Sequence, residues 1–161
     1  MTASGLFHVG LTVADLERSL AFYAGVVGFD VTERLHRRSA AFDDLMGNES
    51  ATEVKVAYLS LNGFTLQLIE YARGAGPALE LDHNRPGNPH LCFYVDDAAA
   101  THARLRSAGD VEITSEPTQV SPTMLSFYTL DPDGVPVEFL ELTEPVQGWN
   151  RSVDITEGVD A

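Results

Sequence analysis

Two histidines, His8 and His90, begin the same short pattern at two places in this 161-residue chain. In each copy an alternating apolar run follows the histidine and ends at an aspartate, and Asp15 and Asp97 are separated by the same 82 residues as the histidines. An offset shared by several features indicates an internal duplication. Because neutral imidazole is a common metal ligand, two matched half-sites could together hold one metal ion.

Each repeat predicts one strand, one helix and then three further strands. In the first repeat, Asp15 can cap the helix, Gly28 can end it, and Asn62-Gly63 is typical of a two-residue hairpin turn. The predicted ranges are 7–13, 15–27 for the helix, 29–35, 53–61 and 64–71. The second repeat predicts strands at 90–95, 111–114, 123–130 and 135–142, with a helix at 98–108 that ends at Gly109.

The sequence therefore predicts an α+β protein of tandem β-α-β-β-β modules. One domain over 1–144 would consist of a module at 6–71, a connector rich in glycine, proline and charge at 72–88, and a module at 89–144. Residues 145–161 have little periodicity and are expected to form a C-terminal tail. The connector is long enough for the modules to pair within one chain or between two chains.

Strand parity indicates which polar side chains share a face. Side chains alternate across a strand, so residues next to the apolar, helix-covered positions point to the opposite side. This opposite face carries one potential ligand on each of four strands: His8, Gln67, His90 and Glu138. Two modules that curve together would gather these two imidazoles, one amide and one carboxylate in one cleft.

Composition narrows the class of protein. A net charge of −14 disfavours nucleic acid and anionic membranes as partners. The chain has no run of about 18 uncharged apolar residues and no signal-peptide pattern, so we expect a cytoplasmic protein without a membrane span. The single Cys92 excludes an internal disulfide, and its place in an alternating strand predicts a buried small hydrophobe rather than a nucleophile.

Over about residues 6–144 the sequence resembles the vicinal oxygen chelate superfamily, also called the glyoxalase and bleomycin-resistance superfamily. The matching phrases are His8-Val9-Gly10-Leu11-Thr12-Val13, Phe22-Tyr23 before Gly28-Phe29, Pro89-His90, and Asp131-Pro132-Asp133-Gly134 running into Val137-Glu138. The resemblance implies paired modules that form a cupped, mostly antiparallel mixed sheet around a divalent metal, commonly in a homodimer. The family's ligand positions fall here on His8, Gln67, His90 and Glu138, a set most similar to that of methylmalonyl-CoA epimerase.

Such a ligand set indicates Lewis-acid chemistry. Two imidazoles, one amide oxygen and one carboxylate leave a divalent Mn, Fe, Co, Ni or Zn ion with net positive charge and two open positions. The ion could stabilise an enediolate or enolate by several kcal/mol. We therefore expect an epimerase or isomerase that transfers a proton next to a chelated carbonyl of a small organic substrate. An acyl-CoA substrate is disfavoured, because its phosphates would meet a strongly acidic protein.

Three alternatives stay open. A glyoxalase-type lyase acting on a thiol adduct uses the same intermediate, and an Fe(II)-dependent dioxygenase would use the same fold. A metal-free protein that binds and sequesters a small-molecule drug belongs to a different functional class and suits the acidic charge.

The general base is predicted among the acidic residues. Glu138 could serve as both ligand and base, and Glu49 lies where the epimerases that this chain resembles carry an acidic catalytic residue; Glu53 is its competitor. Glu70 and Glu141 each lie three residues past a predicted ligand, on the opposite parity, and are interpreted as surface or rim carboxylates.

The remaining polar side chains have no comparable context in the sequence. We expect the other three histidines, His36, His83 and His102, to be exposed to solvent. The basic cluster at Arg34, Arg37 and Arg38 is interpreted as solvated surface.

Overall fold

A computed structural model describes residues 2–47 and 52–144 of the chain. The chain divides into two compact units, Met1–Leu79 and Glu80–Ala161, and the boundary falls within the segment predicted as a connector. Glu49 and the predicted tail at 145–161 lie outside the described residues.

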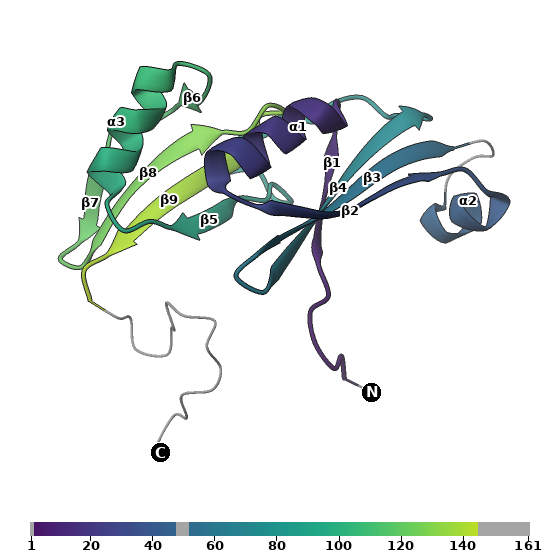
Figure 1. The fold of residues 1–161 in the computed structure, drawn as a ribbon, viewed down its shortest axis with the longest axis horizontal. Coiled ribbons are helices and arrows are strands. Elements are labelled where there is room, and N and C mark those ends of the chain that lie inside the picture. The colour runs from purple at the N-terminus through teal and green to yellow at the C-terminus, as the bar shows by residue number, and fades with distance from the viewer. Residues whose placement is uncertain (1, 48–51, 145–161) are drawn as a thin grey trace. The chain divides into compact units, whose positions relative to one another are not determined.

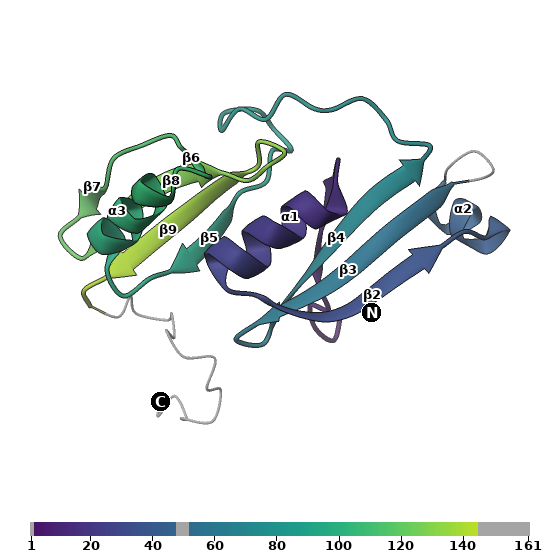
Figure 2. The ribbon, with the colours of Figure 1, turned by 45° about the horizontal axis from the view of Figure 1, so that its top comes forward.

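The first unit is a four-stranded sheet with one face covered by a helix (Figure 1). Its elements are β1 (Val9–Val13), α1 (Leu16–Phe22), the π-helix η1 (Tyr23–Val27), β2 (Asp30–Arg37), α2 (Ala40–Met46), β3 (Glu53–Leu61) and β4 (Phe64–Arg73). The strand order is β1-β4-β3-β2, in which β1 and β4 are parallel and the other pairs are antiparallel. Figures 1 and 2 both show α1 lying across this sheet, where it contacts β3 and β4.

Local chemistry accounts for the boundaries of these elements. The Asp15 side chain accepts a hydrogen bond from the Arg18 amide at 3.0 Å and so caps the start of α1. Gly28 ends the helical segment with φ of 100°, a left-handed value that favours glycine. The hairpin between β3 and β4 turns at Asn62 and Gly63, whose φ angles of 48° and 80° are those of a tight two-residue turn.

The second unit repeats the β-α-β-β-β order of the first, with one additional short strand. Its elements are β5 (Leu91–Tyr94), α3 (Ala98–Ala108), β6 (Glu112–Ile113), β7 (Thr118–Ser121), β8 (Met124–Leu130) and β9 (Pro136–Leu142). The strand order is β5-β9-β8-β6, with β7 also pairing with β8; β5 and β9 are parallel. Asp97 caps α3 through the Ala100 amide at 2.7 Å, and Gly109 ends it with φ of 73°.

Both sheets have an apolar face under the helix and a more open opposite face. On β4, Leu66 and Leu68 are fully buried while Gln67 between them is half-buried. On β9, Val137 is fully buried and the neighbouring Glu138 is half-buried. The α+β class and the tandem β-α-β-β-β modules are therefore confirmed.

The structure corrects several details of the sequence prediction. Helix α2 and strand β7 were not predicted, and β1 begins at Val9, so that His8 immediately precedes the strand. Cys92 is exposed rather than buried, because it lies on the open face of the sheet. Among the described residues no helix is long and apolar enough to cross a membrane.

His102 is buried rather than exposed, with 5% of its surface accessible. It shares the inner face of α3 with Ala98 and Leu105, four residues before it and three after it. Its ring packs edge-on against Phe127, with centroids 5.0 Å apart. Its Nε2 atom lies 3.2 Å from a guanidinium nitrogen of Arg106, which gives the buried imidazole a polar partner.

Candidate functional site

In the first unit, the predicted ligands His8 and Gln67 flank one position on the open face of the sheet. Gln67 lies on β4, where its register partners are Gly10 on β1 and Tyr58 on β3. The Gln67 Nε2 atom donates a hydrogen bond to the Tyr58 hydroxyl at 2.6 Å. The Tyr58 ring also meets the His8 imidazole edge-on, with centroids 5.8 Å apart and planes at 74°. His8, Gln67 and Tyr58 thus form one half-site.

Gly10 leaves open the space that His8 and Gln67 face. A Cβ atom at Gly10 would lie 3.4 Å from Gln67 Oε1 and 4.0 Å from His8 Cδ2. The amide oxygen of Gln67 therefore faces the space over Gly10, while the amide nitrogen of Gln67 donates its hydrogen bond to the Tyr58 hydroxyl. A side chain at position 10 would fill the space between the two potential ligands.

The second unit builds the equivalent half-site from His90, Glu138 and Tyr128. Glu138 lies on β9, opposite Cys92 on β5 and Tyr128 on β8. Its Oε1 accepts a hydrogen bond from the Ser126 hydroxyl at 2.6 Å, and its Oε2 accepts one from the Tyr128 hydroxyl at 2.9 Å. His90 Nε2 lies 3.9 Å from Glu138 Oε2, beyond hydrogen-bond distance. The Tyr128 and His90 rings meet at a centroid distance of 6.2 Å.

In the second half-site, the pKa values of Tyr128 and Cys92 are both raised. Burial, with the hydrogen bond to Glu138 and its charge, raises the pKa of Tyr128 to about 12. Burial of the thiol and the adjacent Glu138 charge raise the pKa of Cys92 to about 12, although the residue as a whole has exposed surface. Tyr128 therefore remains a hydrogen-bond donor at neutral pH. Cys92 remains a thiol, which agrees with the prediction that it is not a nucleophile.

The model of the Glyoxalase/Bleomycin resistance protein/Dioxygenase superfamily matches residues 5–139 of the sequence. The chain belongs to this superfamily. It is 28% identical to the lactoylglutathione lyase of Haemophilus influenzae over 141 residues, which cover 84% of this chain and 91% of that protein. It is 26% identical to the 2-epi-5-epi-valiolone epimerase of an Actinomyces species over 148 residues, which cover 87% of this chain and 80% of the relative.

A solved structure agrees with this assignment at the level of the fold. The glyoxalase family protein APC24694 of Bacillus cereus superposes with a TM-score of 0.73 at 18% identity, covering 88% of this chain and 96% of that protein. The superfamily contains metal-dependent isomerases, lyases and resistance enzymes, together with proteins that are not enzymes.

Members of the superfamily typically bind a divalent metal ion, and the side chains of the two half-sites fit such an ion. The Nδ1 atom of His8 is buried and has no hydrogen-bond partner among the described residues. An unpaired buried polar atom costs about 1–3 kcal/mol, so this imidazole suits a partner from outside the chain. Imidazole nitrogen with amide and carboxylate oxygen is a donor set that divalent transition metals accept.

The predicted ligands therefore come together as two pairs, His8 with Gln67 and His90 with Glu138. In residues 2–47 and 52–144, no cluster of three or more His, Cys, Asp or Glu side chains could hold a metal by itself. Each unit pairs one histidine with one side chain that offers an oxygen donor.

The sequence analysis did not identify Tyr58 and Tyr128 as partners of the ligands. The signal for Tyr58 was available, because a two-residue turn at Asn62-Gly63 fixes the register and places Tyr58 opposite Gln67.

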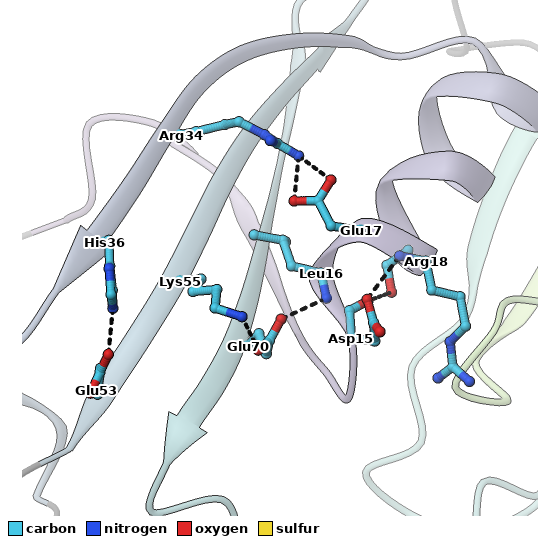
Figure 3. Close-up of polar contacts among 10 residues, drawn as sticks. Asp15, Leu16, Glu17, Arg18, Arg34, His36, Glu53, Lys55 and Glu70 are labelled. Atoms are coloured by element: carbon cyan, nitrogen blue, oxygen red, sulfur yellow. Dashed lines mark hydrogen bonds and ion pairs between the residues drawn. The ribbon is translucent and has the colours of Figure 1, made fainter.

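Glu70 and Glu141, interpreted from the sequence as surface or rim carboxylates, are half-buried and have a role that was not predicted, because each binds the first amide of a helix. Glu70 Oε2 accepts a hydrogen bond from the Leu16 amide at 2.9 Å, and Lys55 Nζ donates to its Oε1 at 2.7 Å (Figure 3). The lysine hydrogen bond, followed by that of the helix amide, lowers the pKa of Glu70. In the second unit Glu141 Oε2 accepts a hydrogen bond from the Ala98 amide at 2.9 Å.

Glu53, another candidate base, lies outside these half-sites. Glu53 on β3 pairs with His36 on the edge strand β2 at 2.7 Å (Figure 3) and precedes Tyr58 by five residues, about 17 Å along the strand. Glu49 is outside the described residues, so its role as a base stays a prediction.

Proposed function

We propose that this chain is a divalent-metal-dependent epimerase or isomerase, which transfers a proton at the carbon next to the chelated carbonyl of a small organic substrate. The supporting observation is the duplicated half-site, in which each unit pairs one histidine with one oxygen ligand held by a tyrosine hydroxyl. In this proposal His8, Gln67, His90 and Glu138 are the four protein ligands of one ion.

The ion, when bound, supplies the positive charge that stabilises an enediolate or enolate. Glu138 is proposed to accept the substrate proton in addition to its role as a ligand. Hydroxyl groups of Ser126 and Tyr128 hold both of its oxygens, and a base works best when its orientation is fixed. Epimerisation must also return a proton to the opposite face of the carbon, and we propose Glu49 for that step.

A lyase acting on a thiol adduct is the second candidate. It is supported by the 28% identity to a lactoylglutathione lyase. The two candidates share the proton transfer and differ in the substrate, so the same half-sites would serve either one. The 26% identity to the 2-epi-5-epi-valiolone epimerase of an Actinomyces species supports the first candidate to a similar degree.

Metal analysis tests the proposed site. Purified protein should carry about one divalent ion per chain, measured by inductively coupled plasma mass spectrometry after dialysis. His8→Ala and His90→Ala should each abolish tight binding. His36→Ala is the matched control, because His36 is exposed and pairs with Glu53. Metal-free wild-type protein that still binds its small molecule would refute the enzyme and favour the drug-binding alternative.

The same variants test how the modules pair. We propose a homodimer, and in a dimer each metal site forms either within one chain or between two. Mixing unfolded His8→Ala and His90→Ala chains and refolding them together restores up to one intact site per mixed dimer if the modules pair between chains. No restoration is possible if each site uses modules of one chain.

Deuterium uptake tests the reaction. Candidate 2-hydroxy acids, 2-keto acids and thiohemiacetals are incubated with metal-loaded protein in D2O and followed by NMR. Deuterium at one carbon with inversion supports the epimerase, whereas conversion of the thiol adduct alone supports the lyase. Oxygen consumption without exchange would show a dioxygenase and refute the proposal.

A further inference from the structure

One half-site contains an amide, Gln67, and the other a carboxylate, Glu138. In both half-sites a tyrosine occupies the paired position on the neighbouring strand. Gln67 lies opposite Tyr58 across β4 and β3, and Glu138 lies opposite Tyr128 across β9 and β8. Tyr58 accepts a hydrogen bond from the amide nitrogen at 2.6 Å, whereas Tyr128 donates one to the carboxylate at 2.9 Å. A phenol hydroxyl can do either, so one residue type serves both ligands.

Gln67 has a requirement that Glu138 lacks. An amide has one oxygen that can ligate a cation and one nitrogen that can only donate hydrogen bonds, whereas the two oxygens of a carboxylate are equivalent. If Gln67 Oε1 binds an ion in the space over Gly10, the nitrogen still needs an acceptor. The Tyr58 hydroxyl is the acceptor that this nitrogen contacts among the described residues.

We propose that Tyr58 is a positioning residue, which holds the Gln67 nitrogen so that the amide oxygen is the end free to ligate the metal. This inference rests on the proposed function, since Gln67 needs a fixed amide orientation only if it is a ligand. Partners of this kind typically change metal affinity 10–100-fold when they are removed.

The test is the affinity for Co²⁺, titrated into chelator-treated protein and followed by visible absorption. Tyr58→Phe removes the hydroxyl but keeps the ring that packs on His8, and we expect it to weaken binding about 10- to 100-fold. Tyr71→Phe is the matched control, because Tyr71 lies on the same strand as Gln67, four residues along. It should leave the affinity unchanged.

A rescue variant separates positioning from a general structural effect. In Gln67→Glu both ends of the side chain are oxygens, and the oxygen that loses Tyr58 can itself bind the ion. Tyr58→Phe should therefore weaken binding less than about threefold in the Gln67→Glu background, compared with the 10- to 100-fold loss in the wild-type background. An equal loss in both backgrounds, or no loss in either, would overturn the role of Tyr58.

Failure of the proposed function gives a different result. If wild-type protein binds no Co²⁺, or if His8→Ala binds it as tightly as wild type, the metal site itself is refuted and Tyr58 has no ligand to position. If Tyr58→Phe does not fold, nitrogen-15 NMR of metal-loaded wild-type protein decides the matter. The Gln67 side-chain NH2 protons should exchange slowly with solvent, and fast exchange would overturn the inference.

Discussion

Replacing Glu70 with alanine should destabilise the first unit through the N-terminus of α1. The Glu70 side chain has 15% of its surface exposed, and its Oε2 accepts a hydrogen bond from the Leu16 amide at 2.9 Å. Leu16 is the first residue of the helix, so its amide has no acceptor within the helix. In Glu70→Ala the Leu16 amide loses its acceptor, and because the site is partly buried, water replaces that acceptor only in part.

The expected cost is about 2 kcal/mol. An unpaired, partly buried amide costs about 1–3 kcal/mol. The negative charge at the helix N-terminus contributes a further 0.3–1 kcal/mol or so. Lys55 also loses its partner, but its side chain is 48% exposed and water replaces the carboxylate. Glu70→Gln should cost less than Glu70→Ala, because the amide oxygen can still accept the hydrogen bond.

Urea denaturation followed by circular dichroism measures this cost. With a slope of about 2 kcal/mol per molar, the midpoint for Glu70→Ala should fall by about 1 M. Glu17→Ala is the control, because that carboxylate also lies in the first turn of α1 but is 72% exposed and pairs with Arg34 at the surface; its midpoint should fall by less than about 0.5 M. A midpoint for Glu70→Ala equal to that of Glu17→Ala would refute the anchoring role.

The pH dependence has a defined sign. The pKa of Glu70 is lowered in the folded protein from its ordinary value of 4.5, so the folded state binds the proton more weakly than the unfolded state. Its stabilising contribution is therefore full above pH 4.5 and is lost as the pH falls through the lowered folded value. The difference between wild type and Glu70→Gln should be constant from pH 6 to 8 or so and should shrink only in acid.

Two further predictions concern the half-sites. Gly10→Ala places a Cβ atom 3.4 Å from Gln67 Oε1 and should weaken Co²⁺ binding about 10-fold; Gly25→Ala, where a Cβ atom meets nothing within 4 Å, should leave it unchanged. With a pKa of about 12, the Cys92 thiol of metal-free protein should react with Ellman's reagent at pH 8 at least about 10 times more slowly than glutathione, because so little thiolate is present. Glu138→Gln should accelerate that reaction, and rapid labelling of the wild-type protein would contradict the raised pKa.

The parts of the fold that depend on local chemistry could be predicted from the sequence. Asp97 and Gly109 bound their helix with hydrogen bonds and dihedral angles that neighbouring residues determine, and α3 has the predicted range, 98–108. The Asn62-Gly63 turn likewise fixed β3 at its predicted bounds. Strand β7, by contrast, is four mostly polar residues whose pairing with β8 is decided by tertiary contacts rather than by an apolar pattern.

For the candidate site, too, the features that depend on local backbone geometry could be predicted from the sequence. Strand parity was enough to place Gln67 and Glu138 on the open faces, because alternation follows from the backbone alone. The hydrogen-bond partners of these side chains depend on strand register as well as on parity. Tyr58 was therefore not predicted, although the two-residue turn at Asn62-Gly63 places it opposite Gln67. The burial of His102 follows from its place on the inner face of α3, three residues before Leu105, and not from the usual exposure of histidine.

The strands that carry the proposed oxygen ligands also carry the glutamates that bind the helix amides. On β4, Gln67 and Glu70 have opposite parity, and so do Glu138 and Glu141 on β9. A register slip of one residue would turn the glutamate away from its helix in the same step that turned the ligand away from the open face. The helix contact therefore disfavours a slip of one residue, because a chain whose glutamate accepts the hydrogen bond from the helix amide also has Gln67 or Glu138 on the open face.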